Sequence, residues 1–152
     1  MKIAELLNPK AIAGELRASG KGEALGELTD VLVSASDNLD AEEVLRVLHE
    51  REALGSTGIG EGVAIPHGKL ARLDRLLLAF GRSRQGVDFD SMDGRQAHLF
   101  FLLVAPEESV GVHLKTLARI SKLLKNPSVR RRLIEAPSEQ LYDIIVEEED
   151  RM

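Results

Sequence analysis

The spacing of hydrophobic residues predicts a long helix near the start of the chain. From residue 23 onward, apolar side chains recur at the three- and four-residue intervals of one helix face: Leu25, Leu28, Leu32 and Ala35. We therefore expect a helix over residues 23–35 with this stripe turned inward. Before it, residues 3–8 predict a short helical turn or an extended lead-in that Pro9 ends, and Ile12 begins a short edge segment.

Two further helices are indicated by their start and stop signals. Asp40 with Glu43 three residues later resembles a capping box, which predicts a helix that runs to the residue before Gly55. Apolar positions at helical spacing over residues 112–124 predict another helix, and Pro127 stops it.

Two stretches are apolar without interruption, residues 76–80 and 99–104. Such runs are typical of strands that are buried on both faces of a sheet. Helical segments lie before and after them, and Asn126 and Ser138 are expected to cap two closing helices. We therefore predict an α/β fold: a three-layer sandwich in which a mixed sheet carries helices on both faces.

Length and composition favour a single domain over residues 1–152. A chain of 152 residues with 43% hydrophobic residues has enough material for one substantial core. No run approaches the roughly 18 apolar residues that a membrane span needs, and residues 1–5 do not open a signal peptide. We expect a cytoplasmic protein that is not embedded in a membrane.

Charge and residue usage exclude several function classes. The formal net charge is -5, aromatic residues make up 3% and tryptophan is absent, so a nucleic-acid partner is not expected. The absence of cysteine excludes disulfides, zinc-thiolate sites and cysteine nucleophiles. No cofactor is implied.

One acidic segment invites a calcium interpretation. It carries Asp88, Asp90 and Asp93, but a helix-loop-helix calcium loop that begins at Asp88 needs glycine at its sixth position and glutamate at its twelfth. Those positions are aspartate and Leu99. We interpret the three aspartates as turn residues and expect no metal site there.

Residues 55–68 are hard to explain by folding alone. Four glycines within residues 55–62 allow positive φ angles and bring backbone N–H groups close to a bound group, as in anion-binding loops. Pro66 restricts the preceding residue to extended geometry, so His67 should stand at the end of a strand-like segment. Gly68 then leaves the imidazole unshielded.

A neutral imidazole is a suitable nucleophile for phosphoryl transfer. The unperturbed pKa of histidine, about 6.5, leaves most rings uncharged at pH 7 with a free lone pair. A phosphoryl group on a ring nitrogen stays reactive enough to be passed on. The alternative is a histidine that only closes a strand and bonds a carbonyl group, and residue types alone leave both interpretations of His67 open.

A longer pattern resembles a known family. Glu52, six intervening residues and the run IGEGVAIPHG at residues 59–68 resemble the signature of the type-2 (fructose, mannitol, nitrogen) enzyme IIA domains of the bacterial phosphotransferase system. The likeness covers nearly the whole chain, from Ile3 to His113. In that family the histidine that matches His67 accepts a phosphoryl group from the phosphocarrier HPr and passes it on.

The resemblance also implies supporting residues. In the family an arginine at the offset of Arg51 lines the active site, and a second histidine occupies the position of His113. By spacing alone, Arg51 also fits a surface arginine paired with a glutamate, and His113 fits a structural residue in the first turn of a helix. The expected site joins these three side chains with backbone amides around the phosphoryl oxygens. The residues are His67, His113 and Arg51, with phosphate-binding glycines Gly58, Gly60, Gly62 and Gly68.

The predicted function is that of a phosphoryl carrier with a phosphohistidine intermediate. An HPr-type phosphocarrier donates to His67, and a free-standing IIA chain resembles the nitrogen-type regulatory branch, which acts on regulatory protein targets. One alternative is a fructose or mannitol IIA subunit that passes phosphate to a IIB protein. Another is a regulatory binding module that acts without phosphoryl transfer.

Overall fold

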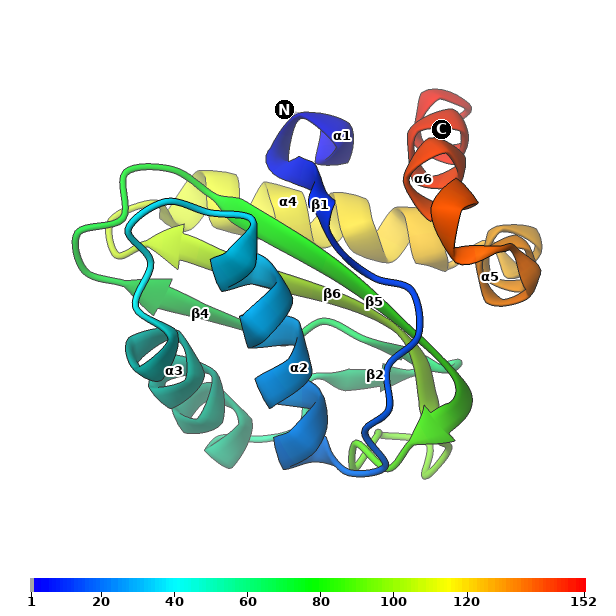
Figure 1. The fold of residues 1–152 in the computed structure, drawn as a ribbon, viewed down its shortest axis with the longest axis horizontal. Helices are drawn as coiled ribbons and strands as arrows, with labels where there is room; N and C mark the ends of the chain where they lie inside the picture. The colour runs from blue at the N-terminus through cyan, green and yellow to red at the C-terminus, as the bar shows by residue number, and fades with distance from the viewer. Residues whose placement is uncertain (1) are drawn as a thin grey trace.

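The computed structural model describes residues 2–152, in which a six-stranded sheet lies between two layers of helices (Figure 1). The strands are β1 (Leu7–Ala13), β2 (Gly58–Gly60), β3 (Val63–Ala64), β4 (His67–Leu70), β5 (Leu77–Val87) and β6 (Ala97–Pro106). Across the sheet the order is β1, β5, β6, β3 and β2, and β4 also pairs with β6. β5 and β6 are antiparallel, whereas β1 is parallel to β5 and both β3 and β4 are parallel to β6. The sheet is therefore mixed, as predicted.

The helices cover both faces of this sheet (Figure 1). α2 (Lys21–Ser34) and α3 (Ala41–Ala53) lie on one face, and α4 (Val110–Leu124), α5 (Pro127–Glu135) and α6 (Leu141–Asp150) lie on the other. Two short elements are α1 (Ile3–Leu6) and the 3-10 turn η1 (Ser138–Gln140). The three-layer sandwich is confirmed. No helix within residues 2–152 combines the length and the hydrophobicity needed to cross a lipid bilayer.

Two helices begin at the caps that the sequence predicts. The side chain of Asp40 accepts a hydrogen bond from the amide of Glu42 at 3.0 Å and starts α3. The side chain of Asn126 accepts from the amide of Ser128 at 2.9 Å and starts α5, where Pro127 occupies the first turn. In both cases a short polar side chain satisfies an amide that has no partner within the helix.

Two predicted boundaries are wrong. Pro9 does not end the opening segment, because β1 continues through it to Ala13. β1 is an edge strand, and the pairing register with β5 shifts around this proline, so its missing N–H breaks no ladder bond there. Ser138 begins the turn η1 and does not cap α6. Its hydroxyl accepts a hydrogen bond from Arg82 at 3.2 Å, and this distant contact was invisible in the local pattern.

The two central strands form the middle of the hydrophobic core. Residues 99–104 of β6 are fully buried, as expected for a strand that is covered on both faces. Phe80 of β5 packs against Phe101 of β6 with ring centroids 4.9 Å apart. Leu103 near the end of β6 lies opposite His67 of β4. The core strand therefore determines where the histidine sits.

Arg82 of β5 is a fully buried cation that is held by carbonyl groups. Its Nε donates to the carbonyl oxygen of Gly14 at 3.0 Å. Its Nη1 donates to the carbonyl oxygens of Leu133, at 3.0 Å, and Ala136, and its Nη2 donates to the hydroxyl of Ser138. Two of these acceptors belong to the C-terminal end of α5, where carbonyls lack helical partners and carry partial negative charge. Arg82 thus fastens α5 to the sheet.

Candidate active site at a pair of histidines

His67 is the first residue of β4, whereas the sequence predicted it at the end of a strand-like segment. The preceding strand β3 ends at Ala64. The carbonyl oxygen of Pro66 accepts a hydrogen bond from the amide of Leu103 at 3.0 Å, and His67 then pairs with Leu103 in parallel register. The sheet therefore fixes the backbone that carries the imidazole.

A main-chain carbonyl selects one tautomer of His67. Nδ1 of the ring lies 2.8 Å from the carbonyl oxygen of Ile65. Because a carbonyl oxygen only accepts hydrogen bonds, Nδ1 carries the hydrogen in this contact, and the lone pair of the neutral ring is on Nε2. The ring is half-buried, which leaves an edge accessible. The two interpretations of His67 are therefore compatible: Nδ1 bonds a carbonyl oxygen, and Nε2 remains available as a nucleophile.

His113 faces His67 from the first turn of α4. The two ring centroids are 5.4 Å apart and the ring planes meet at 69°. His113 is only 6% exposed, and its Nδ1 is buried without a hydrogen-bond partner in the part of the chain that the structure describes. An unpaired buried polar atom costs roughly 1–3 kcal/mol, so such an atom beside a second imidazole points to a functional use.

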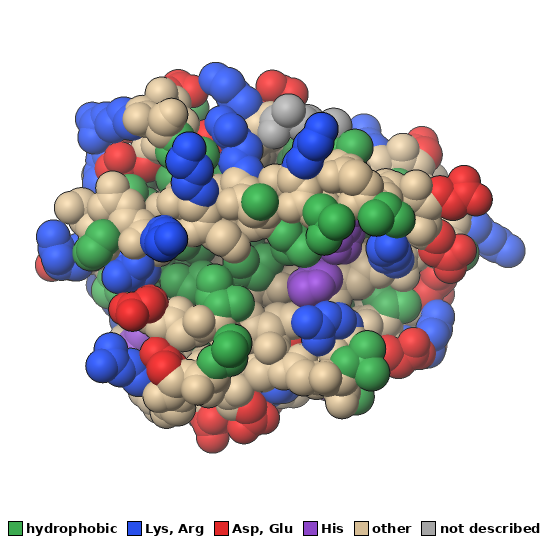
Figure 2. All heavy atoms as spheres, turned by 180° about the vertical axis from the view of Figure 1, so that it is seen from behind, with side chains coloured by type: hydrophobic (Ala, Val, Ile, Leu, Met, Phe, Trp, Pro, Cys, Tyr) green, Lys and Arg blue, Asp and Glu red, His purple; other side chains and the backbone are tan. Residues whose placement is uncertain are grey.

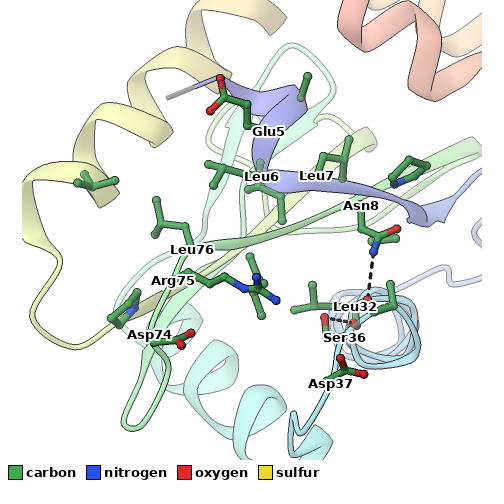
Figure 3. Close-up of a pocket in the computed structure, with 18 of the residues that line it drawn as sticks. Glu5, Leu6, Leu7, Asn8, Leu32, Ser36, Asp37, Asp74, Arg75 and Leu76 are labelled. Carbon is green, nitrogen blue, oxygen red and sulfur yellow. Dashed lines mark hydrogen bonds between the residues drawn. The ribbon is translucent and has the colours of Figure 1, made fainter.

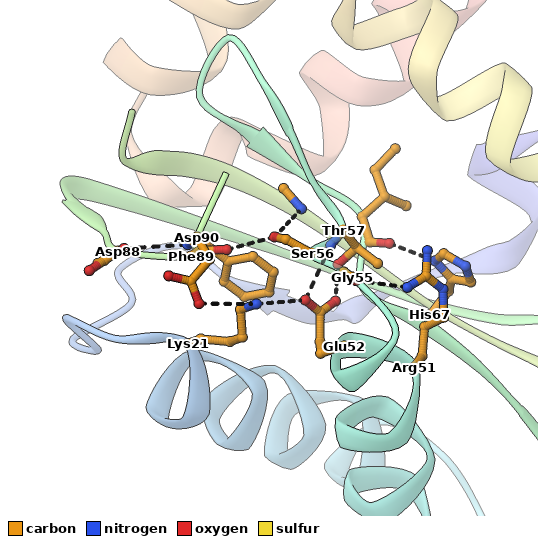
Figure 4. A network of polar contacts seen from close by, with 12 residues as sticks. Lys21, Arg51, Glu52, Gly55, Ser56, Thr57, His67, Asp88, Phe89 and Asp90 are labelled. Carbon is orange, nitrogen blue, oxygen red and sulfur yellow. Dashed lines mark hydrogen bonds and ion pairs between the residues drawn. The ribbon is translucent and has the colours of Figure 1, made fainter. Parts of the chain in front are cut away.

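Arg51 reaches the same place from the last turn of α3. Figure 4 shows its guanidinium beside the ring of His67. Its Nη1 donates to the carbonyl oxygen of Gly55 at 2.8 Å, and no ion pair within residues 2–152 involves it. The pairing with a neighbouring glutamate that spacing allowed is therefore not made. A guanidinium has five N–H donors, so several remain for an anion on His67.

Burial lowers the pKa of both histidines. For His67, removal of the ring from water has the largest effect, and the nearby charge of Arg51 lowers the pKa further, against the carbonyl of Ile65 and the charge of Glu52. For His113, burial again comes first, and His67 and Lys69 also lower its pKa. Both rings are therefore neutral at pH 7, the state in which a ring nitrogen has a lone pair to donate.

This shift predicts a pH dependence. We expect phosphate acceptance by His67 to stay on its plateau as the pH falls through about 6.5, because a lowered pKa keeps the ring neutral in more acidic solution. Stability should fall over the same range, because below about 6.5 the unfolded chain binds protons that the folded protein does not. NMR titration of both rings, with the urea-unfolded chain as reference, measures the shift. A native midpoint at or above the reference value would contradict it.

Three of the predicted phosphate-binding glycines lie away from His67. Gly58 and Gly60 are in β2, and Gly62 leads into β3, which pairs with Leu99 of β6. His67 pairs four residues further along β6, which is roughly 13 Å at about 3.3 Å per residue. A phosphate-binding role for these glycines stays a prediction without geometric support.

The structure gives other reasons for these glycines. A side chain at Gly58 would come within 2.5 Å of the hydroxyl of Ser91, and Gly60 has a φ of +96°, which favours glycine. Gly68 is adjacent to His67, but a side chain there would come within 2.9 Å of Val47, so glycine lets α3 pack closely on β4. Turn geometry and close packing therefore account for these glycines without a bound phosphate.

Two aspartates of the segment after β5 accept local turn hydrogen bonds, and one of them also accepts a bond from the distant residue Glu61. Asp88 accepts from the amide of Asp90 at 3.3 Å, and the two carboxylate oxygens of Asp93 accept from the amides of Arg95 and Glu61 at 3.0 Å each. These contacts agree with the turn interpretation. Within residues 2–152 no group of three or more potential ligands is arranged to hold a metal ion.

A buried network beside the histidines was missed by sequence reasoning. Glu52 follows Arg51 in α3, and its carboxylate is contacted by Thr57 and by Lys21 from the start of α2 (Figure 4). Glu52 at a fixed offset from His67 was a signal that could have been followed. Lys21 offered none, because it lies on a different helix far earlier in the chain.

A sizeable cavity lies away from the two histidines. It has a volume of about 690 Å³ and is bounded by the α1–β1 junction, the end of α2 and the beginning of β5 (Figure 3). Leucines such as Leu6, Leu32 and Leu76 line it together with polar residues that include Asn8 and Arg75. His67 and His113 are not among its lining residues. Figure 2 shows two neighbouring histidine side chains in a shallow hollow of the surface.

Comparison with known proteins agrees with this geometry. Residues 5–148 match the family described as phosphoenolpyruvate-dependent sugar phosphotransferase system, EIIA 2. The chain is 42% identical over 133 residues to the nitrogen regulatory protein of Bradyrhizobium diazoefficiens, covering 88% of this chain and 86% of that protein. It is 40% identical over 151 residues to the fructose-specific EIIABC component of the Bacillus subtilis phosphotransferase system, covering 99% of this chain. The chain spans only 24% of the length of that fructose-specific relative.

A solved structure shares the fold as well as the sequence. The crystal structure of nitrogen regulatory protein IIA-Ntr from Neisseria meningitidis superimposes with a TM-score of 0.87 at 35% identity, covering 94% of this chain and 98% of that one. A histidine with a free Nε2, a second histidine and an arginine thus lie together on a fold shared with IIA proteins. The chain belongs to the EIIA type-2 family of the phosphoenolpyruvate-dependent sugar phosphotransferase system.

Proposed function

We propose that this protein is a phosphoryl carrier that accepts a phosphoryl group from an HPr-type phosphocarrier on Nε2 of His67 and serves a nitrogen-type regulatory branch. The observation that carries the proposal is the hydrogen bond from Nδ1 of His67 to Ile65, which leaves Nε2 as the nucleophile beside Arg51 and His113. Similarity to nitrogen regulatory proteins along most of their length supports the regulatory branch.

Phosphoryl transfer to His67 needs no covalent step from the protein other than attack by the imidazole nitrogen. A bond forms between phosphorus and Nε2 of His67 as the bond from phosphorus to the donor's nitrogen breaks, and the electron pair of the broken bond stays with the donor. The Nδ1 hydrogen of His67 stays in place, so the ring gains positive charge, which the carbonyl of Ile65 stabilises. Arg51 and His113 are placed to meet the phosphoryl oxygens.

The surface around the histidines suits a protein donor. Val110, Val112 and Leu114 in the first turns of α4 are exposed. Figure 2 shows hydrophobic side chains on both sides of the two histidines, with Lys and Arg side chains nearby. Exposed apolar side chains that gather around a reactive group fit a protein contact, and the cations complement a phosphorylated partner.

Reconstitution tests the proposal directly. Purified protein is incubated with phosphoenolpyruvate, enzyme I and HPr, and the product is analysed by intact mass spectrometry and by its stability in acid. We expect one acid-labile phosphate per chain, and none when HPr is omitted. A protein that stays unmodified with an active HPr supply would overturn the carrier function.

Replacing His113 should slow the transfer without preventing it. In a His113→Ala variant, Nε2 of His67 remains available, but a neighbour that can bind the phosphoryl oxygens is lost. We expect about a hundredfold lower single-turnover rate from phospho-HPr, the lower end of what such assistance contributes, because no proton has to move to His113. Circular dichroism checks the fold, and His49→Ala, an exposed histidine of α3, is the matched control. Unchanged transfer in a folded variant would reduce His113 to a structural residue.

A sugar-transport role is the second candidate. It is favoured by the 40% identity to a fructose-specific component, which covers 99% of this chain. If the chain works as a sugar-specific IIA protein, the phosphorylated form should pass its phosphate to a fructose- or mannitol-type IIB protein. Mixing the phosphorylated protein with either IIB protein and following the phosphate separates the two roles.

A further inference from the structure

We propose that Glu52 is a positioning residue that holds His67 in its reactive orientation and tautomer, acting through Thr57 and Ile65. The inference rests on the proposed role of His67 and explains how the imidazole is prepared before a donor arrives. Glu52 does not act on the phosphoryl group. Its influence passes through the backbone of the segment that leads to the histidine.

The carboxylate of Glu52 is enclosed at the end of α3. Its side chain is 4% exposed. It accepts hydrogen bonds from the amide of Thr57 at 3.1 Å and from the hydroxyl of the same threonine. Nζ of Lys21 lies 3.0 Å from it (Figure 4). Because three donors converge on this buried carboxylate, the position of Thr57 is firmly set relative to α3.

One backbone hydrogen bond and one bond from the histidine side chain connect Thr57 to the imidazole of His67. The carbonyl oxygen of Thr57 accepts from the amide of Ile65 at 3.0 Å. The carbonyl oxygen of Ile65 accepts from Nδ1 of His67 at 2.8 Å. Pro66 between them restricts the backbone on both sides. The carbonyl of Ile65, which selects the tautomer of His67, is therefore oriented through Thr57, and Thr57 is in turn hydrogen-bonded to Glu52.

Lys21 completes the network from a different helix. Its ammonium group balances the charge of Glu52, lies 5.1 Å from the ring centroid of Phe89 and is 3.4 Å from a carboxylate oxygen of Asp90. A buried carboxylate without such a partner would be costly. The network thus joins α2, α3 and the segment after β5 at one point beside the histidine (Figure 4).

The charge of Glu52 also acts on the ring. It raises the pKa of His67 against the lowering by burial and by Arg51. During transfer the ring gains positive charge, which the same negative charge stabilises. Removing this charge should therefore make the ring both less well oriented and less able to carry the charge of the reaction.

The test compares Glu52→Gln with Glu50→Gln. Lys21 and Thr57 are hydrogen-bond donors, and the NH2 group of a glutamine is also a donor, so it cannot accept their hydrogen bonds as the carboxylate does. Glu50, the control position, is exposed and pairs only with Arg46 among the described residues. In Glu52→Gln, nitrogen NMR should show His67 as a mixture of tautomers, and the midpoint of its titration should move to lower pH. Single-turnover transfer at saturating phospho-HPr should fall about ten- to a hundredfold with an unchanged KM for the donor. Glu50→Gln should match the wild type.

A second pair of variants covers the case in which Glu52→Gln fails to fold. Thr57→Val removes only the hydroxyl that bonds to Glu52, and Thr57→Ser restores it. The valine variant should show the mixed tautomers and the slower transfer, and the serine variant should show neither. A wild-type tautomer and rate in folded Glu52→Gln, or in Thr57→Val, would overturn the proposal. The tautomer is read without any donor, so its outcome is independent of whether His67 accepts phosphate.

Discussion

A His67→Ala variant should take up no phosphate from phospho-HPr while it remains folded. Nε2 of His67 is the proposed nucleophile, and its neighbour His113 is almost fully buried with an unpaired Nδ1, so it has no comparable exposed nitrogen. The replacement leaves the backbone pairing of β4 with Leu103 intact. Loss of a covalent nucleophile is not compensated by binding groups, and we expect a rate decrease of at least about ten-thousandfold.

Mass spectrometry of the reconstituted mixture measures this outcome. Thermal unfolding of the variant shows whether the fold is preserved, and His49→Ala controls for the loss of a histidine from an exposed position. His113→Ala, which should be slow but competent, separates the accepting residue from a supporting one. Wild-type stoichiometry in folded His67→Ala would move the phosphorylation site to another residue.

An Arg82→Met variant should lose about 3–5 kcal/mol of unfolding free energy. Methionine fills much of the space of the arginine but donates no hydrogen bonds, so the carbonyls of Gly14 and Leu133 lose a charged donor, whereas the carbonyl of Ala136 keeps its bond from Arg84 at 2.9 Å. Each buried polar group that is left unpaired costs roughly 1–3 kcal/mol. Some carbonyls will find water near α5, which keeps the expected total below a simple sum.

Urea denaturation at neutral pH measures this loss. Arg131 is an exposed arginine of α5, and Arg131→Met provides the matched control, with an expected change within about 0.5 kcal/mol. Arg82→Lys keeps the positive charge but loses the several N–H donors of the guanidinium. Its free energy of unfolding should lie between those of the wild type and Arg82→Met. An Arg82→Met variant as stable as the wild type would show that its hydrogen bonds contribute no net stability.

Much of the fold follows from the sequence because it depends on neighbouring residues. The helical stripe over residues 23–35 lies in α2 except for Ala35, which caps its C-terminus, and the apolar runs at 76–80 and 99–104 fall largely within β5 and β6. Caps at Asp40 and Asn126 act within two residues of themselves. His67 could be singled out from its immediate neighbours as well, since the proline before it and the glycine after it are adjacent in the chain.

Other features were settled only when distant segments met. Proline normally ends a regular element, yet Pro9 is tolerated because β1 lies at the edge of the sheet. The glycines of β2 are predicted to bind phosphate, but β2 pairs with β3, and β3 pairs with β6 four residues before the position opposite His67.

The candidate active site combines both kinds of information. The motif identified His67, and resemblance to a family suggested Arg51 and His113, but neither established that these side chains meet. α3, β4 and α4 bring them together because each helix packs on its own face of the sheet. The role of Lys21 could not be found from spacing at all. Its charge matters because it neutralises the buried carboxylate of Glu52. An unpaired carboxylate is costly only where folding removes it from water, so this cost cannot be read from residue spacing.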